Sequence, residues 1–461
     1  MVEVPVKLYM DKVLKAAHHA VRSMAQLSSE TKSAVLLAMA ERIAEQEEAI
    51  VEINDRDVKA AGKSEEKESA VDGESYKDRV KGAVDRVRLA PDDLKDMCED
   101  LRRIAELPDP IGEVTFMQQR PNGMQVSRVR SPLGVIGVIS EFGPRIMTTS
   151  VALCLKSGNV CVYRGGPEWG QTTAKLAELW RDAAAAAGVP EHGLTLIERP
   201  EKEAAIEMFR QAKWIDALIV KGYASLRKAV VEQSRIPILC HDFGVSIMYI
   251  DGEADLPLAQ NIVVNSKIQL ASAGNSIDTL LVHQATARPL VPALIRRLLD
   301  EFKVEVRACP KTVSLIGAQS FTSYKVVQEA TDADYAQQCL SPLLAIKVVN
   351  HFDEALDHMA QYSPLHTAGI VTRDYANAMR FTREADAPAV MVNASTRLHD
   401  GEEFGMGRQI GVGTGRMHAR GPITLDQLTC EKYVVLGTGQ LRHPHPVPVT
   451  YEDAIMLKRP S

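Results

Sequence analysis

The sequence predicts an α/β protein with two doubly wound, mainly parallel sheets. Its 461 residues exceed what one ordinary hydrophobic core accommodates, so two or three domains are expected. From about residue 133, short β-branched runs bounded by Gly and Pro alternate with helical patterns. A second series of the same kind begins near Leu256. Such a βαβ rhythm indicates parallel sheets covered by helices.

The first hundred residues are predicted to be helical. Ser28 is a candidate N-cap, and the apolar residues that follow it recur close to every 3.6 positions. The charged stretch 62–79 is predicted to be either an exposed excursion between helices or locally disordered. Pro108, Pro110 and Gly112 then mark a boundary before the α/β region.

Each α/β series is predicted from its apolar runs. In the first series, strands are expected over 133–140, 159–164, 194–198, 214–220, 236–240 and 246–251, with helices over 172–190, 201–212 and 224–234. In the second series, helices are expected over 261–269 and 289–302, and strands over 279–283, 343–349, 368–372 and 389–393. The glycine-rich segment 404–422 reads as a loop. The tail 441–461 is predicted to be exposed, with a metal-binding tract at His443 and His445 as the alternative.

Composition excludes several classes of protein. A formal net charge of −6 and the lack of dense Lys and Arg runs argue against nucleic-acid binding and against a polybasic membrane surface. No stretch has the length of a membrane span, and the first residues lack a signal peptide's apolar region. The seven cysteines are scattered without a CxxC pair, which predicts reduced thiols in the cytoplasm and no metal site.

One segment has the features of a phosphate-binding turn. Lys156, Ser157 and Gly158 precede a predicted strand, and residues 164–166 (Arg-Gly-Gly) follow it. A glycine turn before a helix N-terminus offers free backbone N–H groups and room for close approach to phosphate. The spacing is not GxGxxG, so a plain tight turn remains the alternative.

Seven short motifs then identify a family resemblance. PLGVIGVI, CLKSGN, RGG, QSRIP, TLLVH, VNASTR and HARGP occur in this order within residues 10–440. Together they resemble the γ-glutamyl phosphate reductases (glutamate-5-semialdehyde dehydrogenases), a branch of the aldehyde dehydrogenase superfamily. The resemblance implies a dinucleotide-binding domain over 1–112 and 131–252, a catalytic-type domain over 253–415, and an oligomerisation element formed by 113–130 with 416–440.

The resemblance also implies a reaction, which is the NADPH-dependent reduction of γ-glutamyl phosphate to glutamate-5-semialdehyde, the second step of proline synthesis. A thiolate attacks the acyl phosphate, and hydride then reduces the thioester, so a cysteine is needed. The family pattern NAKTQRPxxCNxxETLLVH aligns without gaps with residues 265–283, where Asn275 matches. Its cysteine falls on Gly274, which has no side chain.

Other pocket positions also depart from the family. The pattern YExRPNVT appears as residues 140–147, and PRGG appears as 220–223. GxGxCH appears as 242–247 and HSDAI as 366–370, while a carboxylate of the family falls on Gln338. Because these changes are concentrated where the chemistry takes place, we interpret them as a change of function.

The resemblance assigns further residues to ligands. Contacts to the implied cofactor, NADP, fall on Lys156, Ser157, Gly158, Arg164, Gly165, Gly166, Lys221 and Gly222. Substrate contacts fall on Glu141, Arg145, Asn265, Lys267, Asn393, Ser395 and Arg397. Structural support of turns and domain interfaces is the alternative role for the matching residues. Cys240, beside His241 and Asp242, and Cys339, beside Gln338, are candidates to replace the missing thiol, although a buried core cysteine is the simpler interpretation of each.

Three functions therefore stay open. The chain is an active reductase with displaced chemistry, or a catalytically inactive homologue that acts as a ligand sensor, scaffold or assembly partner. Alternatively it has a different acyl-transfer or aldehyde dehydrogenase activity in a remodelled pocket, where Arg145 and Lys221 bind an anion. The expected partners are a small-molecule ligand, further copies of the chain in a dimer or larger homo-oligomer, and an active paralogue or another enzyme of the pathway.

Overall fold

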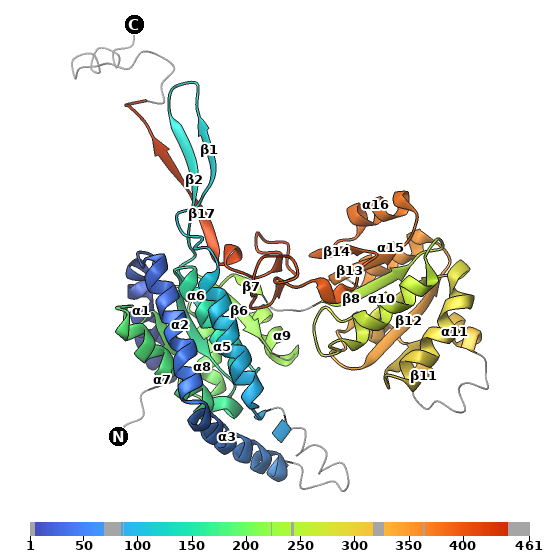
Figure 1. Cartoon of the computed structure of the whole chain (residues 1–461), viewed down its shortest axis with the longest axis horizontal. Coiled ribbons are helices and arrows are strands. Elements are labelled where there is room, and N and C mark those ends of the chain that lie inside the picture. Colours follow the sequence, from blue (N-terminus) through green and yellow to red (C-terminus); the bar gives the residue numbers. More distant parts are fainter. Residues whose placement is uncertain are drawn as a thin grey trace.

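The computed structural model describes residues 5–68, 84, 85, 87–222, 224–240, 244–316, 327–362 and 365–440, with the backbone alone at 64–68, 224 and 240. The predicted excursion at 62–79 therefore lies largely outside the described residues, and the tail 441–461 with its two histidines lies wholly outside them. Two α/β domains lie side by side, and a three-stranded sheet projects from the first of them (Figure 1).

The first domain contains a five-stranded parallel sheet in the order β5-β4-β3-β6-β7. Its strands are β3 (Val135–Ser140), β4 (Val160–Arg164), β5 (Leu194–Leu196), β6 (Ala217–Lys221) and β7 (Ile238–Cys240). Its helices are α6 (Pro144–Lys156), α7 (Gly170–Ala186), α8 (Lys202–Arg210) and α9 (Ala224–Gln233). The chain runs outward from β3 to β5 and then returns to β6, on the other side of β3. The loops after β3 and β6 therefore flank the point where the strand order reverses.

Among the described N-terminal residues, four helices cover this domain. They are α1 (Val6–Met24), α2 (Ser29–Glu45), α3 (Glu47–Glu68) and α5 (Pro91–Glu106). Ser28 caps α2 as predicted, because its Oγ accepts a hydrogen bond of 3.1 Å from the backbone N–H of Thr31. The buried faces of these helices join the core of the five-stranded sheet.

The second domain contains a seven-stranded parallel sheet in the order β11-β10-β12-β9-β8-β13-β14. Its strands are β8 (Val245–Ile250), β9 (Thr279–His283), β10 (Glu305–Ala308), β11 (Val327–Glu329), β12 (Leu343–Val349), β13 (Leu365–Val371) and β14 (Ala389–Val392). Its helices are α10 (Leu256–Ile268), α11 (Gln284–Asp300), α12 (Pro310–Ile316), α14 (Asp332–Ala336), α15 (Phe352–Gln361) and α16 (Tyr375–Glu384). The predicted doubly wound parallel α/β fold is confirmed in both domains.

Two of the predicted domain limits are wrong. β8 pairs with β9 and β13 of the second sheet, so the domains divide between β7 and β8 and not at residue 252. The apolar run at 246–251 could not reveal which sheet it joins, because a buried parallel strand reads the same in either. The segment after residue 409 also returns to the first domain, where Ile410, Ala419 and Ile423 are buried in its core.

The projecting sheet is antiparallel and consists of β1 (Val114–Gln119), β2 (Gln125–Pro132) and β17 (Thr429–Leu436), in the order β1-β2-β17. Its strands come largely from the segments 113–130 and 416–440, and the oligomerisation role that the resemblance implied for these segments stays a prediction. No helix within the described residues is long and apolar enough to cross a membrane.

Candidate functional site

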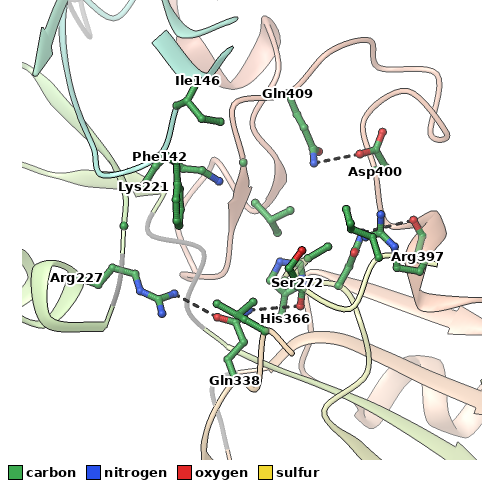
Figure 2. Close-up of a pocket in the computed structure, with 18 residues that line it drawn as sticks. Phe142, Ile146, Lys221, Arg227, Ser272, Gln338, His366, Arg397, Asp400 and Gln409 are labelled. Carbon is green, nitrogen blue, oxygen red and sulfur yellow. Dashed lines mark hydrogen bonds between the residues drawn. The ribbon is translucent and has the colours of Figure 1, made fainter. Parts of the chain in front are cut away.

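A cavity of about 420 Å³ lies between the two α/β domains. Phe142 lines it from the loop after β3, and Lys221 and Gly222 line it from the end of β6. The loop that precedes β9 contributes Leu270, Ser272, Ala273, Gly274 and Asn275. The carboxyl edge of the first sheet therefore faces the amino edge of the second. Figure 2 shows these two groups of side chains on either side of the cavity. A volume of this size suits a small ligand.

Gly274 lies in the wall of this cavity at the tip of its loop. Its carbonyl accepts a hydrogen bond of 2.9 Å from Ser246 Oγ, which fixes the tip against β8. A Cβ placed on Gly274 would lie 3.0 Å from Gln338 Nε2 and 3.0 Å from His366 Nε2. The backbone there does not have the positive φ that excludes other residues. Crowding by two polar side chains, and not backbone strain, thus opposes a side chain at this position.

Gln338 is held with its amide nitrogen toward Gly274. Its Oε1 accepts a hydrogen bond of 3.3 Å from Arg227 Nη1, on α9 of the other domain, and its Nε2 lies 3.5 Å from the Gly274 carbonyl oxygen (Figure 2). Leu340, two residues later, has a φ of 48°, which a branched residue adopts only at a steric cost. The strained turn and the contact across the domains together set where this amide points.

His366 belongs to a chain of three buried polar side chains. Its Nδ1 lies 3.0 Å from Thr367 Oγ1, and this hydroxyl lies 2.9 Å from His399 Nδ1. Burial lowers the pKa of His366 well below its usual value, and the charges of His399, Lys221 and Arg397 add to that effect. Burial also lowers the pKa of His399 to about 4. Both rings are therefore neutral at neutral pH.

Two buried charged residues, Lys267 and Asp278, lie beneath the loop. Lys267 donates to the Ile277 carbonyl at 3.0 Å, and Asp278 accepts backbone N–H groups of Ser246 and Cys339, each at 2.8 Å. Burial raises the pKa of Asp278 to about 6, although these hydrogen bonds and Lys267 oppose the shift. Burial lowers the pKa of Lys267. These groups support the loop from behind and do not line the cavity.

Comparison with known proteins identifies the family. The aldehyde dehydrogenase family model matches residues 7–337. The γ-glutamyl phosphate reductase of Heliobacterium modesticaldum is 41% identical over 428 residues, which are 93% of this chain and 97% of that protein. The crystal structure of γ-glutamyl phosphate reductase from Thermotoga maritima is 32% identical, has a TM-score of 0.86, and is matched over 94% of this chain and 100% of that one.

The chain belongs to the γ-glutamyl phosphate reductase branch of the aldehyde dehydrogenase family. The predicted family is therefore confirmed. A glyceraldehyde-3-phosphate dehydrogenase from Methanocaldococcus jannaschii, complexed with NADP, shares the fold with a TM-score of 0.64 at 14% identity over 95% of this chain and 96% of that one.

Within this family framework, the structure gives the predicted phosphate-binding turn another role. Lys156 is buried, and its Nζ donates to Ser33 Oγ and to the Ala105 carbonyl, both at 2.8 Å. Ser157 Oγ donates back to the Leu153 carbonyl at 2.6 Å. The turn precedes β4, so it lies at the edge of the sheet away from the cavity. Lys156, Ser157 and Gly158 therefore hold the helices together, which contradicts the predicted cofactor contacts.

The residues after β4 and β6 fit a dinucleotide only in part. Lys221 and Gly222 line the cavity, and their predicted contact with the cofactor stays a prediction. Arg164, by contrast, is buried and donates to the Pro200 carbonyl at 3.0 Å, so its guanidinium is engaged with the backbone. Gly165 and Gly166 follow it at the correct edge of the sheet but do not line the cavity. Of the predicted cofactor residues, Lys221 and Gly222 thus line the cavity, whereas Arg164, Gly165 and Gly166 do not.

Arg145 is not a substrate ligand in this structure. Its Nε donates to Asp100 Oδ2 at 2.9 Å and its Nη1 to Asp96 Oδ2 at 3.0 Å, both on α5. Arg408 also pairs with the buried Asp100. The guanidinium of Arg145 is therefore directed away from the cavity, and the prediction that it binds an anion there is wrong. Sequence could not show this, because α5 comes forty-odd positions earlier in the chain.

The other predicted substrate residues divide into two groups. Arg397 lines the cavity, and its Nε donates to Gln269 at 2.7 Å. Asn275, which was predicted among the catalytic residues, also lines it, and its Nδ2 donates to the His399 carbonyl at 2.9 Å. The residues that do not line it are Glu141, Asn265, Lys267, Asn393 and Ser395. Among these, Asn393 joins the ends of β13 and β14 through two 2.9 Å bonds to the backbone of Thr372.

The structure adds residues that the sequence did not select. Arg227, Leu340, Asp400 and Gln409 line the cavity from α9 and from two loops. The position of Arg227 was a weak indication of its role, because its helix, α9, follows β6, and β6 lies beside the point where the strand order reverses. Of the candidate thiols, Cys339 does not line the cavity, and burial with nearby Asp278 raises its pKa to about 12. The side chain of Cys240, together with His241 and Asp242, lies outside the described residues.

Proposed function

We propose that this chain is a member of the γ-glutamyl phosphate reductase branch that binds a small molecule between its domains without thioester chemistry. The observation that supports the proposal is the glycine at position 274. The resemblance places the family's nucleophile there, and the site holds a glycine with Gln338 and His366 within 3.0 Å of where a Cβ would lie.

No described thiol takes over the missing role. A thiol near pKa 12 is almost entirely protonated at neutral pH, so Cys339 is a poor nucleophile. The other described cysteines are free thiols, of which Cys98, Cys154, Cys161 and Cys309 are buried and Cys430 lies on β17, away from the cavity. Among its described residues, this pocket therefore contains no thiol that could carry out the reductase chemistry of the relatives.

The family's cofactor and assembly enter the proposal as expectations. NADP is expected to bind with its nicotinamide beside Lys221 and Gly222, because these residues line the cavity at the reversal point of the sheet. A dimer or larger homo-oligomer is expected through the projecting sheet. Among the described residues, β1 and β17 are the edge strands of this sheet, and they expose Met117, Tyr433 and Val435.

An assay of the reverse reaction tests the proposal. The purified full chain is mixed with NADP⁺, glutamate-5-semialdehyde and phosphate, and NADPH formation is followed by absorbance. The Heliobacterium modesticaldum enzyme serves as the positive control. We expect no turnover above background, together with NADPH binding by calorimetry. Clear turnover would contradict the proposal, and its loss in Cys240→Ala or Cys339→Ala would identify the substitute thiol.

A further inference from the structure

The chain crosses from the second domain back to the first through a compact turn that carries part of the cavity wall. Asp400 and Gln409 line the cavity, and they lie at the two ends of residues 400–409, which we call the crossing turn. Within it, the backbone N–H of Met406 donates to the Gly401 carbonyl at 2.7 Å. The place where the crossing turn is held therefore sets the position of two lining side chains.

The crossing turn is attached to a different domain at each end. Before it, the backbone N–H of Thr396 donates to Ser266 Oγ of α10 at 3.1 Å, and Asn275 Nδ2 donates to the His399 carbonyl at 2.9 Å. After it, Ile410 is buried in the core of the first domain. The turn thus lies at the junction of the domains, and its own contacts decide how it sits there.

A buried carboxylate of the first domain fastens the crossing turn. Asp100, on α5, is 3% exposed, and its Oδ1 accepts a hydrogen bond of 2.6 Å from Arg408 Nε and a second contact from Arg408 Nη2. Arg408 Nη1 also donates to Glu402 Oε2 at 3.1 Å, and Glu402 Oε1 accepts from Arg103 Nη1 of α5 at 3.2 Å. Charge-assisted hydrogen bonds are stronger than neutral ones, and burial strengthens them further. Arg408 therefore ties both the start and the end of the turn to α5.

The lining side chains follow the position of Arg408. Gln409 is its neighbour in sequence, so a displacement of Arg408 also moves the backbone of Gln409. The side chain of Gln409 is joined to the start of the turn, because its Oε1 accepts a hydrogen bond of 3.1 Å from the Gly401 N–H and its Nε2 lies 3.4 Å from Asp400 Oδ2 (Figure 2). A shift of the turn would thus change this face of the cavity as a unit.

A second arginine on the same carboxylate provides an internal comparison. Arg145 Nε donates to Asp100 Oδ2 at 2.9 Å, so each carboxylate oxygen has one arginine. Among the described residues, the ion pairs of Arg145 are with Asp96 and Asp100 of α5 and not with the crossing turn. Removal of either arginine leaves Asp100 with one cationic partner, but only the removal of Arg408 releases the turn.

We propose that Asp100 is a positioning residue of the cavity, which acts through Arg408 to hold the crossing turn so that Asp400 and Gln409 stay in the cavity wall. The role of Asp100 is the same in an active or an inactive pocket, so it goes beyond the proposed function and is independent of it.

Hydrogen–deuterium exchange of the full chain, followed by mass spectrometry, tests this role. We expect the amides of residues 400–409 to exchange about tenfold faster or more in Asp100→Asn and in Arg408→Met, because local opening of the turn is no longer opposed by the charge pair. The Gly401 amide is the most direct reporter, since it donates to Gln409. Arg145→Met is the matched control, and its exchange at 400–409 should equal that of the unmodified chain.

Two results would overturn the role of Asp100. One is unchanged exchange at 400–409 in Arg408→Met, and the other is equal acceleration in Arg145→Met. Thermal unfolding shows whether each variant is folded. Arg408→Met decides the test if Asp100→Asn does not fold, because the Arg408 side chain is 23% exposed and its removal leaves Asp100 paired with Arg145.

A double substitution separates the Asp100–Arg408 contact from independent effects of the two residues. The exchange of residues 400–409 in the variant that combines Asp100→Asn with Arg408→Met should be no faster than in the more affected single variant. Multiplied accelerations would contradict a role through Arg408.

The outcome is separable from the proposed function, because exchange is measured without any ligand. Turnover in the reductase assay contradicts the proposed function and leaves the role of Asp100 in place. Unchanged exchange contradicts the role of Asp100 and leaves a non-catalytic binding protein.

Discussion

The turn at residues 156–159 and the loop tip at residues 273–275 both belong to motifs of the same family, but the turn is packed in the core and the loop tip lines the cavity. In the first, Lys156 and Asn159 match the family, and both are buried among backbone partners, such as the Gly134 N–H that donates to Asn159 Oδ1 at 2.9 Å. At the second, Gly274 departs from the family and faces the cavity. A matching motif therefore reports packing as readily as chemistry, and the burial of each side chain decides between the two.

The largest test of this contrast is Lys156→Met. Removing the ammonium leaves the Ala105 carbonyl and the Ser33 hydroxyl without their buried donor, so we expect a loss of about 3 kcal/mol in the free energy of unfolding. Urea denaturation measures it. Lys175→Met, which removes a surface pair with Glu178, should cost less than about 1 kcal/mol. Equal effects of the two substitutions would show that the turn is not a structural anchor.

The next largest expected effect is a pH dependence of stability that arises at His358, outside the cavity. Burial and Lys347, 3.1 Å away, lower the pKa of His358 to about 3, and Glu354 and Asp332 oppose that shift. As pH falls below about 6.5, the unfolded chain gains a proton at this ring before the folded chain does. Stability is therefore lost on acidification, by about 2 kcal/mol between pH 6.5 and 4.5.

Thermal midpoints across this pH range measure the effect of His358. In His358→Phe the acid-induced decrease should become smaller, although buried His366 and His399 keep part of it. Replacement of the exposed His19 by Phe should leave the pH profile of stability as it is in the unmodified chain. An identical profile in His358→Phe would contradict the assignment.

Restoring the family's residue tests the loop tip directly. Gly274→Cys forces Gln338 and His366 apart by a few tenths of an ångström, and we expect a loss of about 1 to 2 kcal/mol in stability. The new thiol would stand beside the neutral His366 ring at the cavity wall and should react with Ellman's reagent faster than the buried thiols Cys98, Cys154, Cys161 and Cys309 do. We expect no recovery of reductase turnover, because several other pocket groups are changed. Recovery would show that one position alone separates this chain from its active relatives.

The smallest expected effect concerns Arg145. Arg145→Met removes pairs with Asp96 and Asp100, but Asp100 keeps Arg408, and Arg145 is partly exposed, so stability should fall by less than about 1 kcal/mol. The affinity for NADPH, measured by calorimetry, should not change. A large loss of affinity would return Arg145 to the ligand site.

The local residue pattern was sufficient to predict most strands and the loop at residues 273–275. The run at 279–283 is a strand with those limits, as is 343–349, since buried parallel strands are short apolar runs whose flanking residues mark their ends. Gly274 and Asn275 were assigned to the site by the family resemblance, whose pattern aligns without gaps with residues 265–283. Arg145 and β8 were misplaced because an ion pair and a sheet partner depend on residues distant in the chain.

The sequence by itself determined the alternation of strands and helices, the family and the missing side chain at residue 274, because each depends on residues that are neighbours in the chain. Only the tertiary structure decided what surrounds that glycine. Arg227 of the first domain donates a hydrogen bond to Gln338 of the second. Thr367 links His366 to His399, which comes 32 positions after Thr367 in the chain. Donor direction depends on such contacts in space, and hydrogen bonds act over about 3 Å whatever the separation along the chain.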